Sequence, residues 1–155
     1  MPAEPSGELA RLLSHTERRL AQRLAAVLAE EGCSVEQWRV LSIAADGQGH
    51  PMTEIAGYAL LPAPSLTKLV DRMIADNLVY RRPDPTDRRR VLLHLSARGR
   101  ILHERAAHRV HTDQVRLLDA IGDHGELGRT LLLLAAALDE AAPDGVPDAR
   151  RAGRA

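Results

Sequence analysis

The sequence has few aromatic residues and a single cysteine. Only Trp38, Tyr58 and Tyr80 are aromatic among 155 residues, and phenylalanine is absent. A core must therefore be built from Leu, Ala, Val and Ile. Because runs of strand-favouring residues are also rare, the composition indicates packed helices rather than a β-sandwich. The lone Cys33 excludes an intramolecular disulfide framework and is typical of a reducing compartment.

Long apolar runs are missing as well. No stretch approaches the ~18 residues of a membrane span, and the opening MPAEPSGELA lacks the charged-then-apolar order of a signal peptide. No P-loop, G-x-S-x-G or H-E-x-x-H motif occurs. We therefore expect one cytoplasmic domain, with no membrane contact, no enzymatic activity and no cofactor.

The net charge of the whole chain is zero, but the charge is unevenly distributed along it. The chain carries 21 basic and 21 acidic residues, and Lys68 is its one lysine. Residues 65–105 hold ten basic and five acidic residues, a net of +5, whereas 1–64 hold five and eight and 106–155 hold six and eight. This asymmetry favours a polyanion-binding face in the middle third. A solvated loop with scattered arginines is the alternative.

Apolar residues spaced three and four apart predict helices along most of the chain. The S-x-x-Q pattern of Ser34 and Gln37 is a capping box that begins the second helix. Pro62 and Pro64 suit a helix start, where a missing N–H does no harm. The predicted helices span 8–31, 34–46, 53–60, 65–76, 96–121 and 126–142, and the segment 47–51 is predicted to be a loop.

Two short runs rich in strand formers, LVYRR (78–82) and VLLHL (91–95), flank the turn-rich PDPTDRRR. They predict a β-hairpin whose tip carries arginines. Three short helices followed by a hairpin form a winged helix-turn-helix, in which the third short helix enters the major groove and the wing reaches the backbone or minor groove. The predicted fold is therefore mainly α with a small β-hairpin. We expect Asp87 to hold the Arg88 guanidinium in an extended rotamer for a narrow minor groove.

Three segments carry a family resemblance: QWRVL (37–41), LTKLVDRM (66–73) and NLVYRRPDPTDRRRVLLHLSARGR (77–100). They closely resemble the MarR family of bacterial transcriptional regulators, over roughly Leu9 to Leu138. The most specific element is a D-x-x-D-R-R wing followed by a strand and a Ser-x-x-Gly helix start.

The resemblance implies a homodimeric, sequence-specific regulator of transcription, with repression the expected mode, acting on double-stranded DNA. Its operator is expected to be an inverted repeat with half-sites about one helical turn apart. By this resemblance, 8–142 is a MarR-type domain with a winged helix-turn-helix lobe at 34–96. Helices at 8–31 and 97–142 form the dimer, and 1–7 and 143–155 are disordered.

Carried onto this chain, the resemblance assigns DNA contacts to the recognition helix and the wing. The N-terminus of the preceding helix is assigned a phosphate. The chain departs from the family at Pro62-Ala63-Pro64, where serine or arginine is frequent. These side chains cannot read base edges by hydrogen bonds, so DNA shape and the wing are expected to contribute more specificity. The predicted DNA-binding residues are Thr53, Ser65, Lys68, Arg72, Arg82, Asp87, Arg88, Arg89 and Arg90.

Small phenolic or other aromatic effectors release many family members from DNA, which makes such an effector a candidate partner here. The resemblance places its pocket near His15, Arg18 and Trp38. Two weaker sensor hypotheses are a metal site among His103, His108 and His111 and oxidation of Cys33, which has no neighbouring cation in sequence to activate it. The alternative to regulation by DNA binding is a winged helix that serves only as a protein-interaction module.

Overall fold

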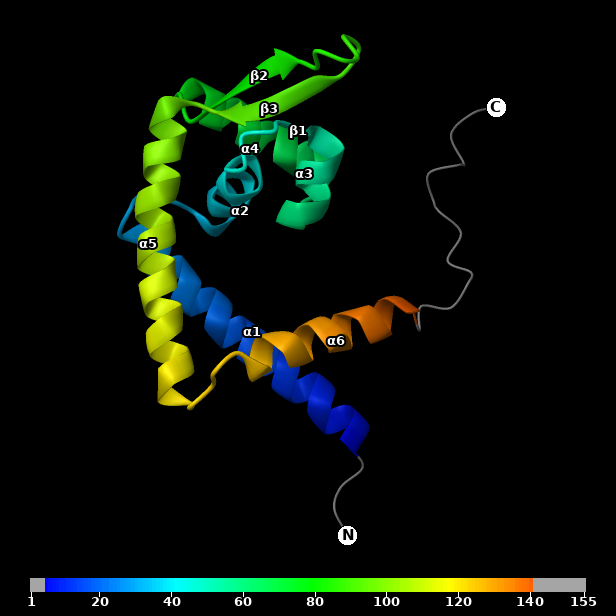
Figure 1. Ribbon diagram of the computed structural model, residues 1–155, viewed down its shortest axis with the longest axis vertical. Coiled ribbons are helices and arrows are strands. Elements are labelled where there is room, and N and C mark those ends of the chain that lie inside the picture. Colours follow the sequence, from blue (N-terminus) through cyan, green and yellow to red (C-terminus); the bar gives the residue numbers. More distant parts are fainter. Residues whose placement is uncertain (1–4, 141–155) are drawn as a thin grey trace. The chain divides into compact units, whose positions relative to one another are not determined.

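A computed structural model describes residues 5–140 (Figure 1). The chain divides into two compact units, which meet between Gln114 and Val115. Its elements follow the predicted order, with one addition. They are α1 (Pro5–Ala29), α2 (Val35–Ala44), β1 (His50–Pro51), α3 (Met52–Ala59), α4 (Ala63–Ala75), β2 (Val79–Pro83), β3 (Val91–Leu95), α5 (Ala97–Ala120) and α6 (Glu126–Glu140).

The prediction of a mainly helical winged helix-turn-helix is confirmed, but the loop predicted at 47–51 is wrong at its end. His50 and Pro51 form β1, which pairs antiparallel with β3 at Leu93 and Leu92, so the sheet has the order β1-β3-β2. Two residues are too few for any strand periodicity in the sequence. The strand is possible because Gly49, at φ +76°, lets the backbone pass directly against the His94 ring.

Local signals set several helix ends. The capping box is confirmed: the Gln37 N–H donates to Ser34 Oγ at 3.1 Å, and the Ser34 N–H donates to Gln37 Oε1 at 3.0 Å. The first helix begins at Pro5, earlier than predicted, so residues 5–7 are helical. The other residues predicted to be disordered, 1–4 and 143–155, lie outside the described residues. The fourth helix begins at Ala63 rather than Ser65, because prolines are tolerated in a first turn.

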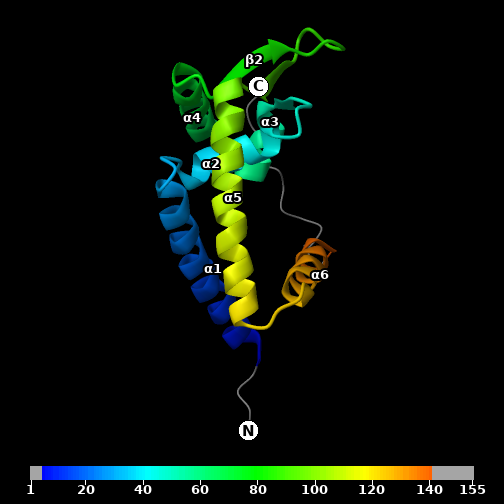
Figure 2. The ribbon, with the colours of Figure 1, turned by 60° about the vertical axis from the view of Figure 1, so that its left-hand side comes forward.

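The core of the first unit lies where α2, α3 and α4 pack beneath the sheet (Figure 2). On α4 an apolar stripe is buried, with Leu66, Val70 and Met73 fully enclosed. Since this stripe faces inward, the opposite stripe of α4 must face solvent. Other fully enclosed side chains of this core are Leu28, Val40, Leu41, Ile55, Val79 and Leu93.

Residues 115–140 of the second unit contain the end of α5, a turn and α6. Gly122 and Gly125, both at positive φ, make the predicted break between the helices. The Asp123 carboxylate accepts the N–H of Leu127 at 2.9 Å and so caps the start of α6. None of the α6 side chains is buried. Among the described helices, none combines the length and hydropathy needed to cross a bilayer.

Candidate nucleic-acid interface

The exposed stripe of α4 carries the polar side chains predicted to read DNA. Ser65, Lys68 and Arg72 are all exposed, on the side opposite the buried stripe. Asp71 lies on the same solvent face and would repel phosphate. Its carboxylate is instead neutralised by Arg81 of β2, whose Nη2 lies 2.8 Å from Asp71 Oδ1. This ion pair joins α4 directly to the wing.

The hairpin wing extends from the helices of the first unit (Figure 1). Its two strands are in register from Val79 opposite Leu95 to Pro83 opposite Val91. Arg82 lies on β2, and Arg88, Arg89 and Arg90 follow in the turn; all four are exposed.

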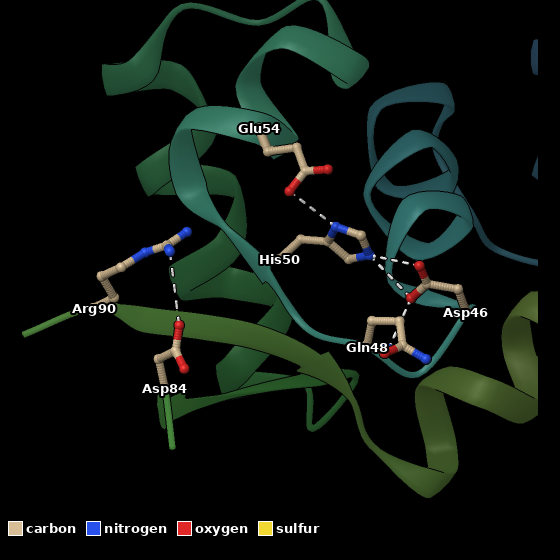
Figure 3. A network of polar contacts seen from close by, with 6 residues as sticks. All are labelled: Asp46, Gln48, His50, Glu54, Asp84 and Arg90. Atoms are coloured by element: carbon tan, nitrogen blue, oxygen red, sulfur yellow. Dashed lines mark hydrogen bonds and ion pairs between the residues drawn. The ribbon is translucent and has the colours of Figure 1, made fainter. Parts of the chain in front are cut away.

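The wing tip is an ordered turn organised around Asp84, which is only 7% exposed. Its carboxylate accepts hydrogen bonds from the hydroxyl and the N–H of Thr86, at 2.7 and 2.8 Å. Its backbone N–H donates to the Arg90 carbonyl at 2.9 Å, and an Arg90 guanidinium nitrogen lies 3.8 Å from its carboxylate (Figure 3). The Thr86 hydrogen bonds, assisted by Arg90, hold the pKa of the Asp84 carboxyl below its usual value.

Asp87 has a different role from the one predicted. Its carboxylate accepts the backbone N–H of Arg89 at 3.1 Å, and its carbonyl accepts the N–H of Arg90 at 2.9 Å. Within residues 5–140 no ion pair joins Asp87 to Arg88. Aspartate commonly bonds a backbone N–H two residues on, and that local bond prevails here. Asp87 therefore shapes the turn that presents Arg88.

The interface thus gathers α4 and the wing on the same unit, with Thr53 exposed in the first turn of α3. Two residues that sequence reasoning missed support it. Arg81 was not singled out, because its partner Asp71 belongs to another element. Asp84 could have been found, since an Asp followed two residues later by Thr is typical of a side-chain-capped turn.

Comparison with known proteins identifies this arrangement. The profile of the MarR family matches residues 33–91. The HTH-type transcriptional regulator FarR of Neisseria gonorrhoeae is 31% identical over 108 residues, which cover 70% of each chain. The chain belongs to the MarR family. The chain spans about half the length of other curated relatives that it matches, 48% of each.

Solved structures show the same fold. The transcriptional repressor CouR, bound to a 23-mer DNA duplex, is 26% identical with a TM-score of 0.70, over 90% of this chain and 97% of that chain. NadR, in complex with 4-hydroxyphenylacetate, is 25% identical with a TM-score of 0.69, over 94% and 98%. FarR and the MarR family protein SPO1453, which is 29% identical to this chain with a TM-score of 0.71 over 84% of this chain and 96% of that chain, are transcriptional regulators, in line with the expectation of a non-enzymatic role.

The three residues predicted for an effector pocket lie in different surroundings. Trp38 stacks on His103 of α5, with ring centroids 5.1 Å apart and planes 13° from parallel, while His15 and Arg18 are exposed on α1. A cavity of about 600 Å³ in the first unit is lined by none of these three. Its walls include Glu31, Asp76, Leu78, Arg98, Ile101 and Arg105.

Two arginines on the wall of this cavity differ in their pairing: Arg105 is paired with Glu31, and Arg98 is not in an ion pair among residues 5–140. Glu31, whose side chain is 5% exposed, pairs with both Arg105 and Arg109 of α5. The hydrogen bond from Arg109, together with Arg105, lowers the pKa of the Glu31 carboxyl although its burial opposes this. Arg98 lines the same cavity and is in no ion pair among residues 5–140.

The three histidines proposed as a metal site have different surroundings. His103 is engaged by Trp38, and His108 and His111 are exposed. Within residues 5–140 no group of three or more His, Cys, Asp or Glu side chains is placed to hold a metal ion.

Oxidant treatment should leave the protein unchanged in DNA affinity. Cys33 is buried, its thiol donates to the Ser34 carbonyl at 3.4 Å, and burial raises its pKa to about 11. Since the thiolate is the reactive form, very little is available at neutral pH. We expect hydrogen peroxide to leave operator affinity within about twofold of the untreated value, measured by fluorescence anisotropy. A Cys33→Ser variant that lost a clear peroxide response of the wild type would contradict this expectation.

Proposed function

We propose that the chain is a homodimeric repressor of transcription that binds an inverted repeat in double-stranded DNA through α4 and the wing. The observation that carries the proposal is the joining of an exposed Ser65–Lys68–Arg72 stripe to an ordered, arginine-bearing hairpin. A helix of this kind fits the major groove, and an arginine on a rigid turn fits a narrow minor groove. The DNA complex of the similar repressor CouR supports the same use of this fold.

Thr53 extends the proposed contact surface. It lies at the start of α3, where backbone N–H groups without helical partners and the helix dipole favour a phosphate. The Pro62-Ala63-Pro64 start of α4 offers methyl and ring surfaces but no side-chain donor. We infer that base-specific hydrogen bonds are few and that much of the selectivity comes from groove shape read by the wing.

Exposed leucines support a homodimer. On α1 of the first unit, Leu9, Leu12 and Leu20 are each about half exposed, at 51%, 47% and 45%. On α6 of the second unit, Leu132 and Leu133 are 74% and 67% exposed. Soluble monomers rarely leave so many leucines on consecutive helical turns in water. A second copy of the chain is the partner that the family membership favours.

A small aromatic effector is the second part of the proposal. NadR, which has the same fold, binds 4-hydroxyphenylacetate. The cavity beside α5 has a size ordinary for small-molecule sites. Its Ile101 and Leu78 offer apolar contact, and the guanidinium of Arg98 could receive a carboxylate. A phenolic or aryl carboxylate that enters there would touch both α5 and the turn between α4 and β2.

Removing the wing-tip charge should weaken operator binding and flatten its salt dependence. We expect Arg88→Ala to lose about tenfold in affinity, because one groove-inserted guanidinium contributes about 1–3 kcal/mol of contact energy. The slope of log affinity against log salt should fall by about 1 as one fewer counterion is released. The measurement is a fluorescence-anisotropy titration with DNA from the upstream region of the protein's own gene, at two salt concentrations.

Arg19→Ala, which removes the same charge from exposed α1, is the matched control and should bind as the wild type does. Equal affinity of wild type and Arg88→Ala on a tightly bound operator would remove the wing from the mechanism. If no DNA is bound tightly in a genome-wide selection, the interaction-module alternative gains support. Capture of protein partners from nuclease-treated extract would then test it.

A further inference from the structure

His50 lies between two carboxylates at the entry to the helix-turn-helix (Figure 3). Its Nε2 is 2.9 Å from both carboxylate oxygens of Asp46, in the turn after α2. Its Nδ1 is 3.1 Å from Oε2 of Glu54, in the first turn of α3. The imidazole side chain is only 12% exposed, whereas the two carboxylates are about half exposed.

This geometry is satisfied by only one protonation state of the ring. An ionised carboxylate accepts hydrogen bonds and donates none, whereas a neutral imidazole has one donor nitrogen and one acceptor nitrogen. Each ring nitrogen of His50 faces a carboxylate oxygen. Only the imidazolium can donate on both sides. A neutral ring would leave a nitrogen lone pair directed at either Asp46 or Glu54.

Among the described residues, the charges that act on the ring are the carboxylates of Asp46 and Glu54. The Gln48 N–H donates to Asp46 Oδ1 at 2.9 Å and holds that carboxylate in the turn. Across the sheet, the residue opposite His50 is the apolar Leu93. The neighbouring β3 residue, His94, stacks on Tyr80 instead, with ring centroids 5.4 Å apart.

Burial of the ring opposes its protonation, but the hydrogen bonds and charges of Asp46 and Glu54 outweigh it. The pKa of His50 is therefore raised above its usual value. The same contacts act on the partner: the Gln48 N–H first, and then His50, lower the pKa of the Asp46 carboxyl. The charged clamp therefore persists to a higher pH than an ordinary protonated histidine would.

We propose that protonated His50 is a positioning residue that clamps the start of α3 to the end of α2, and that loss of its proton weakens DNA binding. The DNA part of this proposal rests on the proposed function. Glu54 directly follows Thr53, the residue proposed to lie at a phosphate. Deprotonation takes the three side chains from a net charge of −1 to −2 and releases a carboxylate beside that phosphate. It also leaves one of the two ring nitrogens unable to donate to its carboxylate.

The direction of the pH effect follows from the charge of the clamp. Because the folded protein holds the proton more tightly than the unfolded chain, the stabilisation is fully present below the usual pKa of histidine. It is lost as pH rises through the raised pKa. Since the protonated clamp also favours a nearby phosphate, operator binding should be tightest in mildly acidic buffer and weaken through mildly alkaline buffer.

The test compares wild type, His50→Gln and His108→Gln from about pH 6 to about pH 8.5 at constant ionic strength. His108 is an exposed histidine on α5, so its variant controls for histidine loss as such. Operator affinity of wild type and of His108→Gln should fall by about threefold or more over this range. His50→Gln, which cannot take a proton, should show a clearly flatter profile.

Two further readouts separate this proposal from the proposed function. The His50 ring resonances should titrate with a midpoint above that of an ordinary histidine. The pH dependence of the denaturation midpoint should differ between wild type and His50→Gln. If DNA is not bound at any pH, the proposed function and the DNA part of the proposal fail, and these readouts judge the clamp alone. A His50 midpoint at or below the ordinary value, or identical affinity profiles for wild type and His50→Gln, would overturn the inference.

Discussion

Gly99→Ala should destabilise the protein by about 3 kcal/mol or more, at the upper end of what overpacking costs. Gly99 is buried in the first turn of α5. A Cβ built there would lie 2.9 Å from the carbonyl carbon of Leu78 and collide with its oxygen. That oxygen cannot easily move aside, because it accepts the Ser96 N–H at 3.0 Å. The destabilisation is measured as the free energy of unfolding in urea.

Gly57→Ala is the matched control, since it lies within α3 of the same unit and has open space where its Cβ would be. In a helix interior, replacing glycine with alanine should stabilise the protein by about 0.5–1 kcal/mol. The two glycine variants should therefore move stability in opposite directions. A Gly99→Ala protein as stable as the wild type would show that the α5–Leu78 junction is not closely packed.

The Gly99 contact explains the Ser-x-x-Gly pattern that follows the wing. Ser96 Oγ accepts the Gly99 N–H at 2.9 Å and donates to the Asn77 carbonyl at 2.6 Å. Ser96 therefore caps α5 and ties it to Asn77, which follows the C-cap of α4 and adopts a left-handed φ of 56°. Glycine is needed at position 99 so that α5 can approach the backbone of Leu78. The pattern fixes the long helix α5 to the segment between α4 and β2.

Much of the fold could be predicted because its signals are local. The buried stripe of α4 repeats at three and four residues, the capping box at Ser34 lies within one turn, and the wing is bounded by turn residues. The strand β1 could not be predicted, because its two residues are held by pairing with β3, about forty residues later.

Predictions at the site failed where the partner is remote or where a backbone group competes. Arg81 pairs with Asp71, ten residues earlier on another element. Trp38 is engaged by His103 of α5, a contact that no spacing indicates. Asp87 was expected to bind the Arg88 guanidinium, but its carboxylate accepts the backbone N–H of Arg89 instead. Sequence thus predicted the exposed polar residues of α4 and the wing better than it predicted their partners.

The double variant Leu132→Glu, Leu133→Glu should be monomeric and should bind the operator about 100-fold more weakly, or worse. The two leucines are the most exposed on α6. Within one chain they contribute little packing, so acidic replacements should leave the fold intact. In the proposed dimer they would place several carboxylates in an apolar interface, which is strongly unfavourable. A monomer engages one half-site and loses the effective concentration that links the two, a factor of about 10²–10⁴.

Light scattering gives the mass, circular dichroism the fold, and anisotropy the affinity. Leu60→Glu, at an equally exposed leucine (75%) outside the proposed interface, should stay dimeric. A double variant that remains dimeric would exclude this face of α6 from the interface. A folded monomer with unchanged operator affinity would instead mean that one copy is sufficient for recognition. In that case the inverted repeat is not required, because each half-site would then be bound independently of its neighbour.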